Sequence, residues 1–249
     1  MKRALIIGGT RGMGRALAEH YLAQGMAVTV CGRHPDVLAG SSLARHPNLT
    51  VVALDIGDAA AVARVVAQAA APTLDLLVVT AGLYFNTRTH PLDEATTLQM
   101  LATNVTGLAN ALEAGARCML AQGHGQMAAI ASVAGVLKDY PGASTYSATK
   151  RSVLSLCDTY RKALAPFGVA VTAIAPGYVD TERLRELNGG NARHKPFLVS
   201  EAQAVQRISQ AIAERQAVCQ FPWPMHALVR LINLLPRVPR LPSFEPPTH

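Results

Sequence analysis

Short apolar runs alternate along the chain with longer segments in which apolar residues recur at helical spacing. Each run is almost continuously apolar, which is typical of a strand buried on both faces of a sheet. The runs cover Ala4–Ile7, Ala27–Cys31, Leu49–Leu54, Leu74–Val79, Met127–Ala131 and Val169–Ala175. The helical segments cover about Gly12–Gln24, Ala59–Ala71, Leu92–Gln122, Thr145–Ala165 and Glu201–Arg215. This alternation predicts the α/β class: a single-domain, Rossmann-like, doubly wound parallel sheet with helices on both faces.

The last part of the chain departs from this alternation and is rich in proline. We expect residues 1–221 to form the α/β domain, with a substrate lid near 182–198, and residues 222–249 to form a C-terminal extension. Pro224–Leu235 predicts a short amphipathic helix, followed by an extended polyproline segment. Its predicted apolar face comprises Leu228, Leu231, Ile232 and Leu235. The extension caps an active site, packs on a subunit interface or lies on a membrane surface; we favour interface packing.

Composition excludes several classes of protein. Of 249 residues, 50% are apolar and 16% are charged, so the chain can bury a large core and is not disordered. No apolar run approaches the roughly 18 residues of a membrane span. The apolar stretch after Met1-Lys2-Arg3 is too short for a signal peptide, so we expect a cytoplasmic protein. The four cysteines form no CxxC pair or zinc-type cluster, so we expect free buried thiols and no metal.

The net charge of +7 raises the question of an anionic partner. Aromatic residues make up only 5% of the chain, and no basic block is interleaved with them. This argues against nucleic acid and favours an anionic cofactor or substrate.

The first predicted strand runs directly into a glycine-rich turn, Gly8–Gly14, and then into a helix. Glycines let a backbone approach a pyrophosphate at a helix N-terminus, although a tight turn without a ligand has the same pattern. Arg11 lies in this turn, and Arg33 follows the second strand, where NAD-binding chains carry an acidic residue. Guanidinium groups without a carboxylate favour the 2′-phosphate of NADP(H) over NAD(H), unless both arginines are simply solvated. Asp55, after the third strand, either hydrogen-bonds the adenine or caps the next helix.

Tyr146 and Lys150 stand four residues apart, which places both side chains on one helix face. A nearby ammonium group favours the phenolate, so we expect Lys150 to lower the pKa of Tyr146. The YxxxK spacing alone is common, and its significance comes from the accompanying residues. These are Asn104 in a long helical segment, Ser132 directly after the fifth strand, and Pro176–Thr181 after the sixth.

Taken together, these motifs resemble the short-chain dehydrogenase/reductase family, in its compact single-domain form, over about Lys2 to Val218. The resemblance implies a catalytic tetrad of Asn104, Ser132, Tyr146 and Lys150. In those roles Tyr146 gives a proton to the substrate carbonyl and Ser132 binds its oxygen. Lys150 holds the nicotinamide ribose, and Asn104 holds a water that relays protons. The expected cofactor site comprises Gly8, Thr10, Arg11, Gly12, Met13, Gly14, Arg33, Asp55, Ile56, Ala81, Gly82, Tyr146, Lys150, Pro176, Gly177, Val179 and Thr181.

The chain departs from the family pattern at several positions. Ile7 replaces a threonine before the first glycine, and Val79 and Thr80 replace the asparagines of Asn-Asn-Ala-Gly. That motif braces the central sheet, so its loss puts stability in question. After Val218 the usual glycine-rich ending is replaced by the proline-rich extension.

The resemblance implies an NADP(H)-dependent oxidoreductase that interconverts a small carbonyl compound and an alcohol. Two alternatives are a non-catalytic NADP(H)-binding regulator or scaffold, and a lyase or isomerase without net redox chemistry. A homodimer or homotetramer, paired through the helices at about Leu98–Gln122 and Thr145–Ala165, is also implied. The lid carries Arg193 and Lys195, which would suit an anionic substrate, but we favour an ordinary solvated lid.

Overall fold

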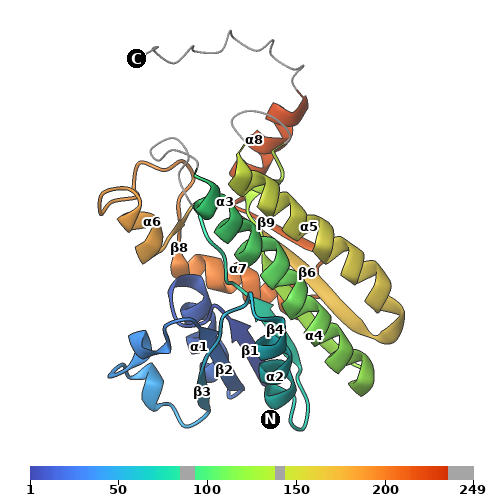
Figure 1. Ribbon diagram of the computed structural model, residues 1–249. Helices are drawn as coiled ribbons and strands as arrows, with labels where there is room; N and C mark the ends of the chain where they lie inside the picture. The colour runs from blue at the N-terminus through green and yellow to red at the C-terminus, as the bar shows by residue number, and fades with distance from the viewer. Residues whose placement is uncertain (85–92, 138–143, 235–249) are drawn as a thin grey trace.

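A seven-stranded parallel sheet forms the centre of the molecule in the computed structural model, which describes residues 1–84, 93–137 and 144–234 (Figure 1). The strand order is β3-β2-β1-β4-β5-β6-β9, and each neighbouring pair is parallel. The strands are β1 (Arg3–Ile7), β2 (Ala27–Gly32), β3 (Leu49–Ala53), β4 (Leu76–Val79), β5 (Gly125–Ile130), β6 (Val169–Pro176) and β9 (Val218–Phe221). The order reverses between β1 and β4, the point where doubly wound sheets bind ligands.

Helices cover both faces of this sheet. The α-helices of the described residues are α1 (Gly12–Ala23), α2 (Ala59–Ala69), α3 (Glu94–Leu101), α4 (Leu108–Gln122), α5 (Thr145–Leu164), α6 (Glu182–Glu186), α7 (Glu201–Ala213) and α8 (Trp223–Leu234). Of these, α6 lies in the predicted lid and α8 follows the edge strand β9. Along β1, Leu5 and Ile7 pack with residues of α2, α4 and α5, whereas Ala4 and Ile6 pack with α1 and α7 (Figure 1). Both sides of β1 are therefore buried, which is why its sequence shows no polar alternation.

The long helical segment predicted at Leu92–Gln122 is not one continuous α-helix. Within its described part, α3 and α4 are separated by a π-helical turn, Ala102–Gly107. Such turns often mark functional positions, and this one contains Asn104. A hydrophobic pattern reports which face of a helix is buried and carries no signal for one extra residue in a turn.

The edge strand β9 was not predicted. Its four residues, Val218–Phe221, are few for a pattern, and only Cys219 and Phe221 are buried. Near the predicted lid, a two-stranded sheet joins β7 (Val179–Asp180) to β8 (Val199–Ser200). This small sheet brings together the two ends of the segment that contains α6.

Thr80 braces the sheet at the position where the sequence departs from the family motif. Its Oγ1 donates a hydrogen bond to the carbonyl oxygen of Ile7 at 3.2 Å. The backbone N–H groups of Thr80 and Ala81 donate to the same oxygen at 2.8 and 3.0 Å. A threonine therefore supplies a link between β1 and β4, and the expected weakness of this region is not seen in its hydrogen bonding.

Candidate active site

The glycine-rich turn is held by close backbone contacts. Gly8 has a φ of +93°, and a Cβ built there would lie 2.4 Å from the backbone nitrogen of Ala81. A Cβ on Gly14 would lie 2.4 Å from the carbonyl oxygen of Gly8. By contrast, a Cβ on Gly12 would meet no atom within 4 Å, and its φ is +49°. The turn is thus packed on its inner side and open beside Gly12.

The helix α1 begins within this turn, at Gly12. Its N-cap, Arg11, makes no side-chain capping bond, and the first turn contains no acidic residue. The N-termini of α2, α3, α5 and α7 are capped by the side chains of Asp58, Asp93, Ser144 and Ser200. Uncapped N–H groups and the positive end of the helix dipole favour an anion at the start of α1.

The end of β2 has no room for an acidic side chain. A Cβ on Gly32 would lie 2.5 Å from Oγ1 of Thr10, which is buried. Arg33, the next residue, is exposed, as is Arg11. Among the described residues, neither guanidinium group forms a salt bridge, so both are available to an anionic ligand.

The structure excludes one interpretation of Asp55. The residue that caps α2 is Asp58, whose Oδ1 accepts a hydrogen bond from the N–H of Ala61 at 2.9 Å. Asp55 is exposed and accepts a bond from the N–H of Gly57 at 2.8 Å. Its neighbour Ile56 is buried and packs closely on Gly107. A Cβ built on Gly107 would lie 2.6 Å from Cγ2 of Ile56.

Lys150 is buried beneath the candidate site, with 5% of its surface exposed. Its Nζ donates a hydrogen bond to the carbonyl oxygen of Ile130, at the end of β5, at 2.8 Å. A Cβ on Gly82 would lie 3.1 Å from the same nitrogen, so glycine leaves room for the ammonium group. Burial lowers the pKa of Lys150 to about 8, because a charged amine is poorly solvated there.

Tyr146 and Ser132 are hydrogen-bonded to each other across the ends of α5 and β5. The ring of Tyr84 packs edge-on against Tyr146, with centroids 4.7 Å apart. Burial raises the pKa of Tyr146 to about 12, and the bond with Ser132 opposes this rise only in part. The expectation that Lys150 lowers this pKa is therefore wrong for the protein alone. The Nζ of Lys150 lies 5.8 Å from the Tyr146 ring centroid and donates to Ile130.

Asn104 is fixed by hydrogen bonds to the backbone of Leu83. Its Oδ1 accepts from the Leu83 N–H at 2.7 Å, and its Nδ2 donates to the Leu83 carbonyl at 2.9 Å. The Nδ2 also donates to Oγ1 of Thr149 at 3.1 Å. Both amide protons are thus used, which leaves only acceptor capacity on Oδ1 for a water. Asn104 joins the π-helical turn, the segment after β4 and α5.

Sequence reasoning missed several residues that position this site. Leu83 and Ile130 act through backbone atoms, which carry no residue signature. Thr149 gave a weak signal, because it stands between Tyr146 and Lys150 and its hydroxyl also donates to the carbonyl oxygen of Tyr146 at 2.8 Å. Tyr84 gave no signal before its ring contact was known.

The segment after β6 turns into the predicted lid. Gly177 donates its N–H to the carbonyl oxygen of Phe221 on β9 at 2.7 Å. Thr181 caps α6 by accepting a bond from the N–H of Leu184 at 3.2 Å. Pro176 and Val179 are buried nearby, at the end of β6 and in β7. The predicted cofactor residues of this segment therefore follow a strand of the sheet and precede the lid.

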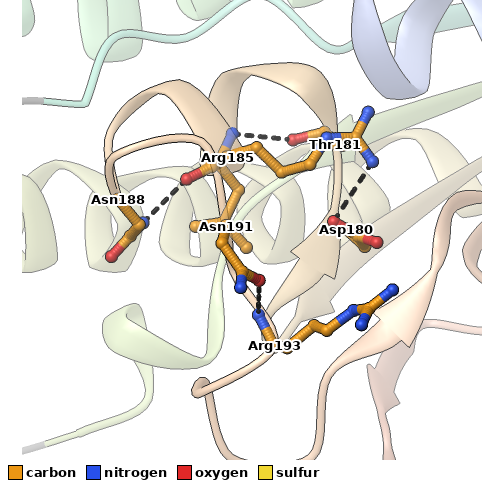
Figure 2. Close-up of polar contacts among 7 residues, drawn as sticks. Asp180, Thr181, Arg185, Asn188, Asn191 and Arg193 are labelled. Carbon is orange, nitrogen blue, oxygen red and sulfur yellow. Dashed lines mark hydrogen bonds and ion pairs between the residues drawn. The ribbon is translucent and has the colours of Figure 1, made fainter.

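One ion pair lies within the lid, and another joins the lid to a residue before it. Figure 2 shows Arg185 next to Asp180, and their Nη1 and Oδ1 atoms are 3.3 Å apart. Arg193 donates its backbone N–H, not its guanidinium group, to Oδ1 of Asn191 at 2.9 Å (Figure 2). Arg183 pairs with Glu186 at 3.1 Å. Gly189 and Gly190 both have positive φ angles, as a bend at this point requires. Movement of this segment and an anionic substrate stay predictions.

The C-terminal helix α8 leaves most of its predicted apolar face uncovered in the single chain. Leu228 and Leu231 are exposed and Ile232 is half-buried, whereas Met225 and Val229, which lie outside that face, are buried. Leu235 lies outside the described residues. What covers the predicted face stays a prediction.

Surface shape alone does not identify the candidate site. A hollow of about 1070 Å³ lies between α7, β9 and α8, with Gln206, Arg207 and Trp223 on its walls, apart from the predicted tetrad. The described residues contain no cluster of side chains suited to a metal ion, and none of their helices is long and apolar enough to cross a membrane. The chemistry is therefore argued from the side chains around Tyr146.

Comparisons with known proteins agree with this arrangement. The family model described as short chain dehydrogenase matches residues 2–192. An uncharacterized oxidoreductase of Myxococcus xanthus is 32% identical over 240 residues, covering 94% of this chain and 93% of the relative. A sorbitol dehydrogenase of Cereibacter sphaeroides is 34% identical, covering 73% and 72%. The structure of a short-chain type dehydrogenase/reductase from Mycobacterium ulcerans is 25% identical, with a TM-score of 0.76, covering 88% and 86%.

Proposed function

This chain belongs to the short chain dehydrogenase family, and from that premise we propose that it is an NADP(H)-dependent oxidoreductase. It interconverts a carbonyl compound and an alcohol by hydride transfer. The observation that carries the proposal is the hydrogen bond between Tyr146 and Ser132, with the buried ammonium group of Lys150 beside the Tyr146 ring. This arrangement offers a proton donor and a partner for a carbonyl oxygen at one point.

The residues at the start of α1 fit a dinucleotide. The space beside Gly12 is open, the helix N-terminus is uncapped, and Arg11 is exposed next to it. A pyrophosphate needs this combination of close backbone approach, free N–H groups and positive charge. Gly82 and Lys150 then face the nicotinamide end of the cofactor, and the turn at Pro176–Thr181 borders it.

The preference for NADP(H) over NAD(H) rests on Arg11, Gly32 and Arg33. NAD-binding sites carry a carboxylate at the end of the second strand, and the contact between Gly32 and Thr10 leaves no room for one. Arg33 instead presents an exposed guanidinium group, which binds a 2′-phosphate by charge-assisted hydrogen bonds.

A bound nicotinamide supplies the hydride. Tyr146 donates its phenol proton to the carbonyl oxygen, and Ser132 stabilises the negative charge that develops there. Burial raises the pKa of Tyr146, so the phenol is protonated at neutral pH and can act as the proton donor. Lys150 uses one donor on Ile130 and has others free for the ribose of the cofactor.

Asn104 acts in this proposal mainly as a brace. Its hydrogen bonds hold Leu83, and the next residue, Tyr84, packs against Tyr146. Any water on the proton path would bind at Oδ1, because the amide protons are taken. The substrate is a small carbonyl compound or alcohol, and we propose a homodimer or homotetramer.

The test is NADPH consumption, followed by absorbance across ketones, aldehydes and acyl thioesters, with NADH and a Tyr146→Phe variant in parallel. We expect turnover with NADPH that falls about 10²- to 10⁴-fold in the variant, while NADPH binding by calorimetry is unchanged. Tight NADPH binding without any turnover would contradict the reductase and favour a regulator or a non-redox lyase or isomerase.

A further inference from the structure

The outer side of α8 exposes an apolar surface. The buried residues Met225 and Val229 attach the helix to the rest of the protein. Away from them lies the outer face of α8, which we define as Leu228, Leu231 and Leu234, with 41%, 58% and 81% of their surfaces exposed. Trp223 and Arg230 lie at its flank and line the hollow beside α7. Single exposed apolar residues are ordinary, but a set along one helix marks an interaction surface.

This helix is fixed next to the candidate active site. The Nδ2 of Asn233 donates a hydrogen bond to the carbonyl oxygen of Val136, in the segment that follows Ser132, at 2.9 Å. At the other end, a Cβ on Gly177 would lie 3.3 Å from Met225. Figure 1 shows α8 at the same end of the molecule as α6 and the start of α5. The outer face is therefore held in a defined orientation, beside the segments that follow β5 and β6.

The C-terminal segment that contains this face carries charge of one sign in the sequence. From Arg215 to Phe244 the sequence contains four arginines and no aspartate or glutamate, in a chain of net charge +7. Arg230 is exposed on α8 itself. Apolar residues with tryptophan and arginine on one helix are the features of a helix that lies in the interface of an anionic lipid bilayer.

A second copy of the chain fits this face less well. A two-fold contact would place the same basic segment on both sides, and the segment offers no carboxylate to pair with its arginines. An anionic lipid surface both covers the apolar side chains and neutralises the arginines.

We propose that the outer face of α8 docks the protein on an anionic lipid bilayer. The helix lies parallel to the surface, with Leu228 and Leu231 inserted below the head groups and Arg230 at their level. Docking is independent of the proposed redox activity and needs no bound cofactor.

The test uses the full-length protein and sedimentation with vesicles. We expect binding to vesicles of phosphatidylglycerol and phosphatidylcholine, and at least tenfold weaker binding to phosphatidylcholine alone. Leu228→Glu should weaken partition into the vesicles about tenfold or more, because a leucine that enters the lipid is replaced by a charged side chain. Arg230→Gln should weaken it about fivefold.

The matched control is Phe167→Glu, since Phe167 is 57% exposed, close to the 58% of Leu231, and lies outside the two segments expected to pair subunits. It should change vesicle binding less than twofold, and circular dichroism checks the fold of each variant. If Leu228→Glu does not fold, Arg230→Gln and the loss of wild-type binding at high salt still test the proposal. The proposal is overturned if wild type does not sediment with anionic vesicles, or if Phe167→Glu is equally impaired. A fall in oligomer mass for Leu228→Glu without vesicle binding would assign the face to a second copy and equally overturn it.

Discussion

The glycine-rich turn and the proposed catalytic region around Tyr146 are stabilised in opposite ways. At Gly8 and Gly14 the backbone is so close to its neighbours that a Cβ would lie 2.4 Å from another atom. Around Tyr146, long side chains link separate segments instead: Asn104 and Lys150 donate hydrogen bonds to backbone carbonyl groups of other segments. The first region therefore tolerates no added side chain at Gly8 or Gly14, and the second depends on the side chains of Asn104 and Lys150.

The largest effect should come from adding a methyl group to the turn. Gly14→Ala places a Cβ 2.4 Å from the carbonyl oxygen of Gly8 and from Oγ1 of Thr80. We expect the free energy of unfolding to fall by about 3 kcal/mol or more, which lowers Tm by roughly 6 °C or more. NADPH binding should weaken by about 100-fold or more. Gly189→Ala, in the lid, meets no atom within 4 Å and carries only the strain of its +67° φ. If calorimetry finds that Gly14→Ala and Gly189→Ala lower the free energy of unfolding equally, close packing at Gly14 is not what limits the turn.

The second effect concerns the buried ammonium group of Lys150 and its pH dependence. Burial lowers the pKa to about 8 from 10.5, so between these values the folded protein binds fewer protons than the unfolded chain. The free energy of unfolding therefore rises by about 1 kcal/mol per pH unit in this range. Below about pH 8 the lysine is protonated in both states, so this rise with pH is absent. Relative to Lys150→Met, wild type should gain about 2 kcal/mol between pH 8 and 10, as measured by urea unfolding.

The titration of Tyr146 does not interfere in that window. Burial raises its pKa to about 12 from 10.0, so its contribution is fully present below pH 10 and is lost only as the pH rises toward 12. A difference between wild type and Lys150→Met that stays constant from pH 8 to 10 would mean that the ammonium group is well solvated. Tyr146 is present in both proteins, so its titration cancels in the difference between them, as does that of Tyr21, whose pKa burial also raises to about 12.

The contrast between the two regions also explains what the sequence could predict. The parallel, doubly wound sheet follows from the alternation of apolar runs and helices. The turn follows from the spacing of its glycines, since a Cβ at Gly8 or Gly14 would meet neighbouring atoms. The partners of Asn104 and Lys150 are backbone carbonyls, which every residue has. Their identity depends on packing between distant segments, so no local pattern reveals it.

The edge strand was missed for a related reason. The strand β9 gains its place by pairing with β6, and its own residues alternate too briefly to indicate it. On α8, apolar residues lie on two sides, and tertiary contacts with Gly177 and Val136 decide which side is buried. The pKa of Tyr146 was also mispredicted, because spacing shows that Lys150 is near and does not show that its ammonium group donates elsewhere.

The third effect tests Asn104 as a brace in the catalytic region. Asn104→Ala removes both hydrogen bonds to Leu83, which frees Tyr84 from its position against Tyr146. We expect kcat to fall about 30-fold, with NADPH affinity unchanged, since loss of such bonds costs about 1–3 kcal/mol. Thr149→Val removes one bond to the same amide and should cost less than fivefold. A larger effect of Thr149→Val than of Asn104→Ala in steady-state kinetics would contradict the brace.

We expect the smallest effect at Arg33, an exposed side chain at the edge of the proposed cofactor site. Arg33 is exposed and forms no salt bridge with a described residue, so its removal should leave the fold intact. For Arg33→Ala we expect the ratio of kcat/KM for NADPH to that for NADH to fall about tenfold, because one charge-assisted hydrogen bond to a phosphate is lost. Arg45→Ala, at an exposed arginine outside the proposed cofactor site, should leave that ratio unchanged. If Arg33→Ala lowers kcat/KM for both cofactors equally, Arg33 acts on the whole dinucleotide, and the preference for NADP(H) would then rest on Arg11 alone.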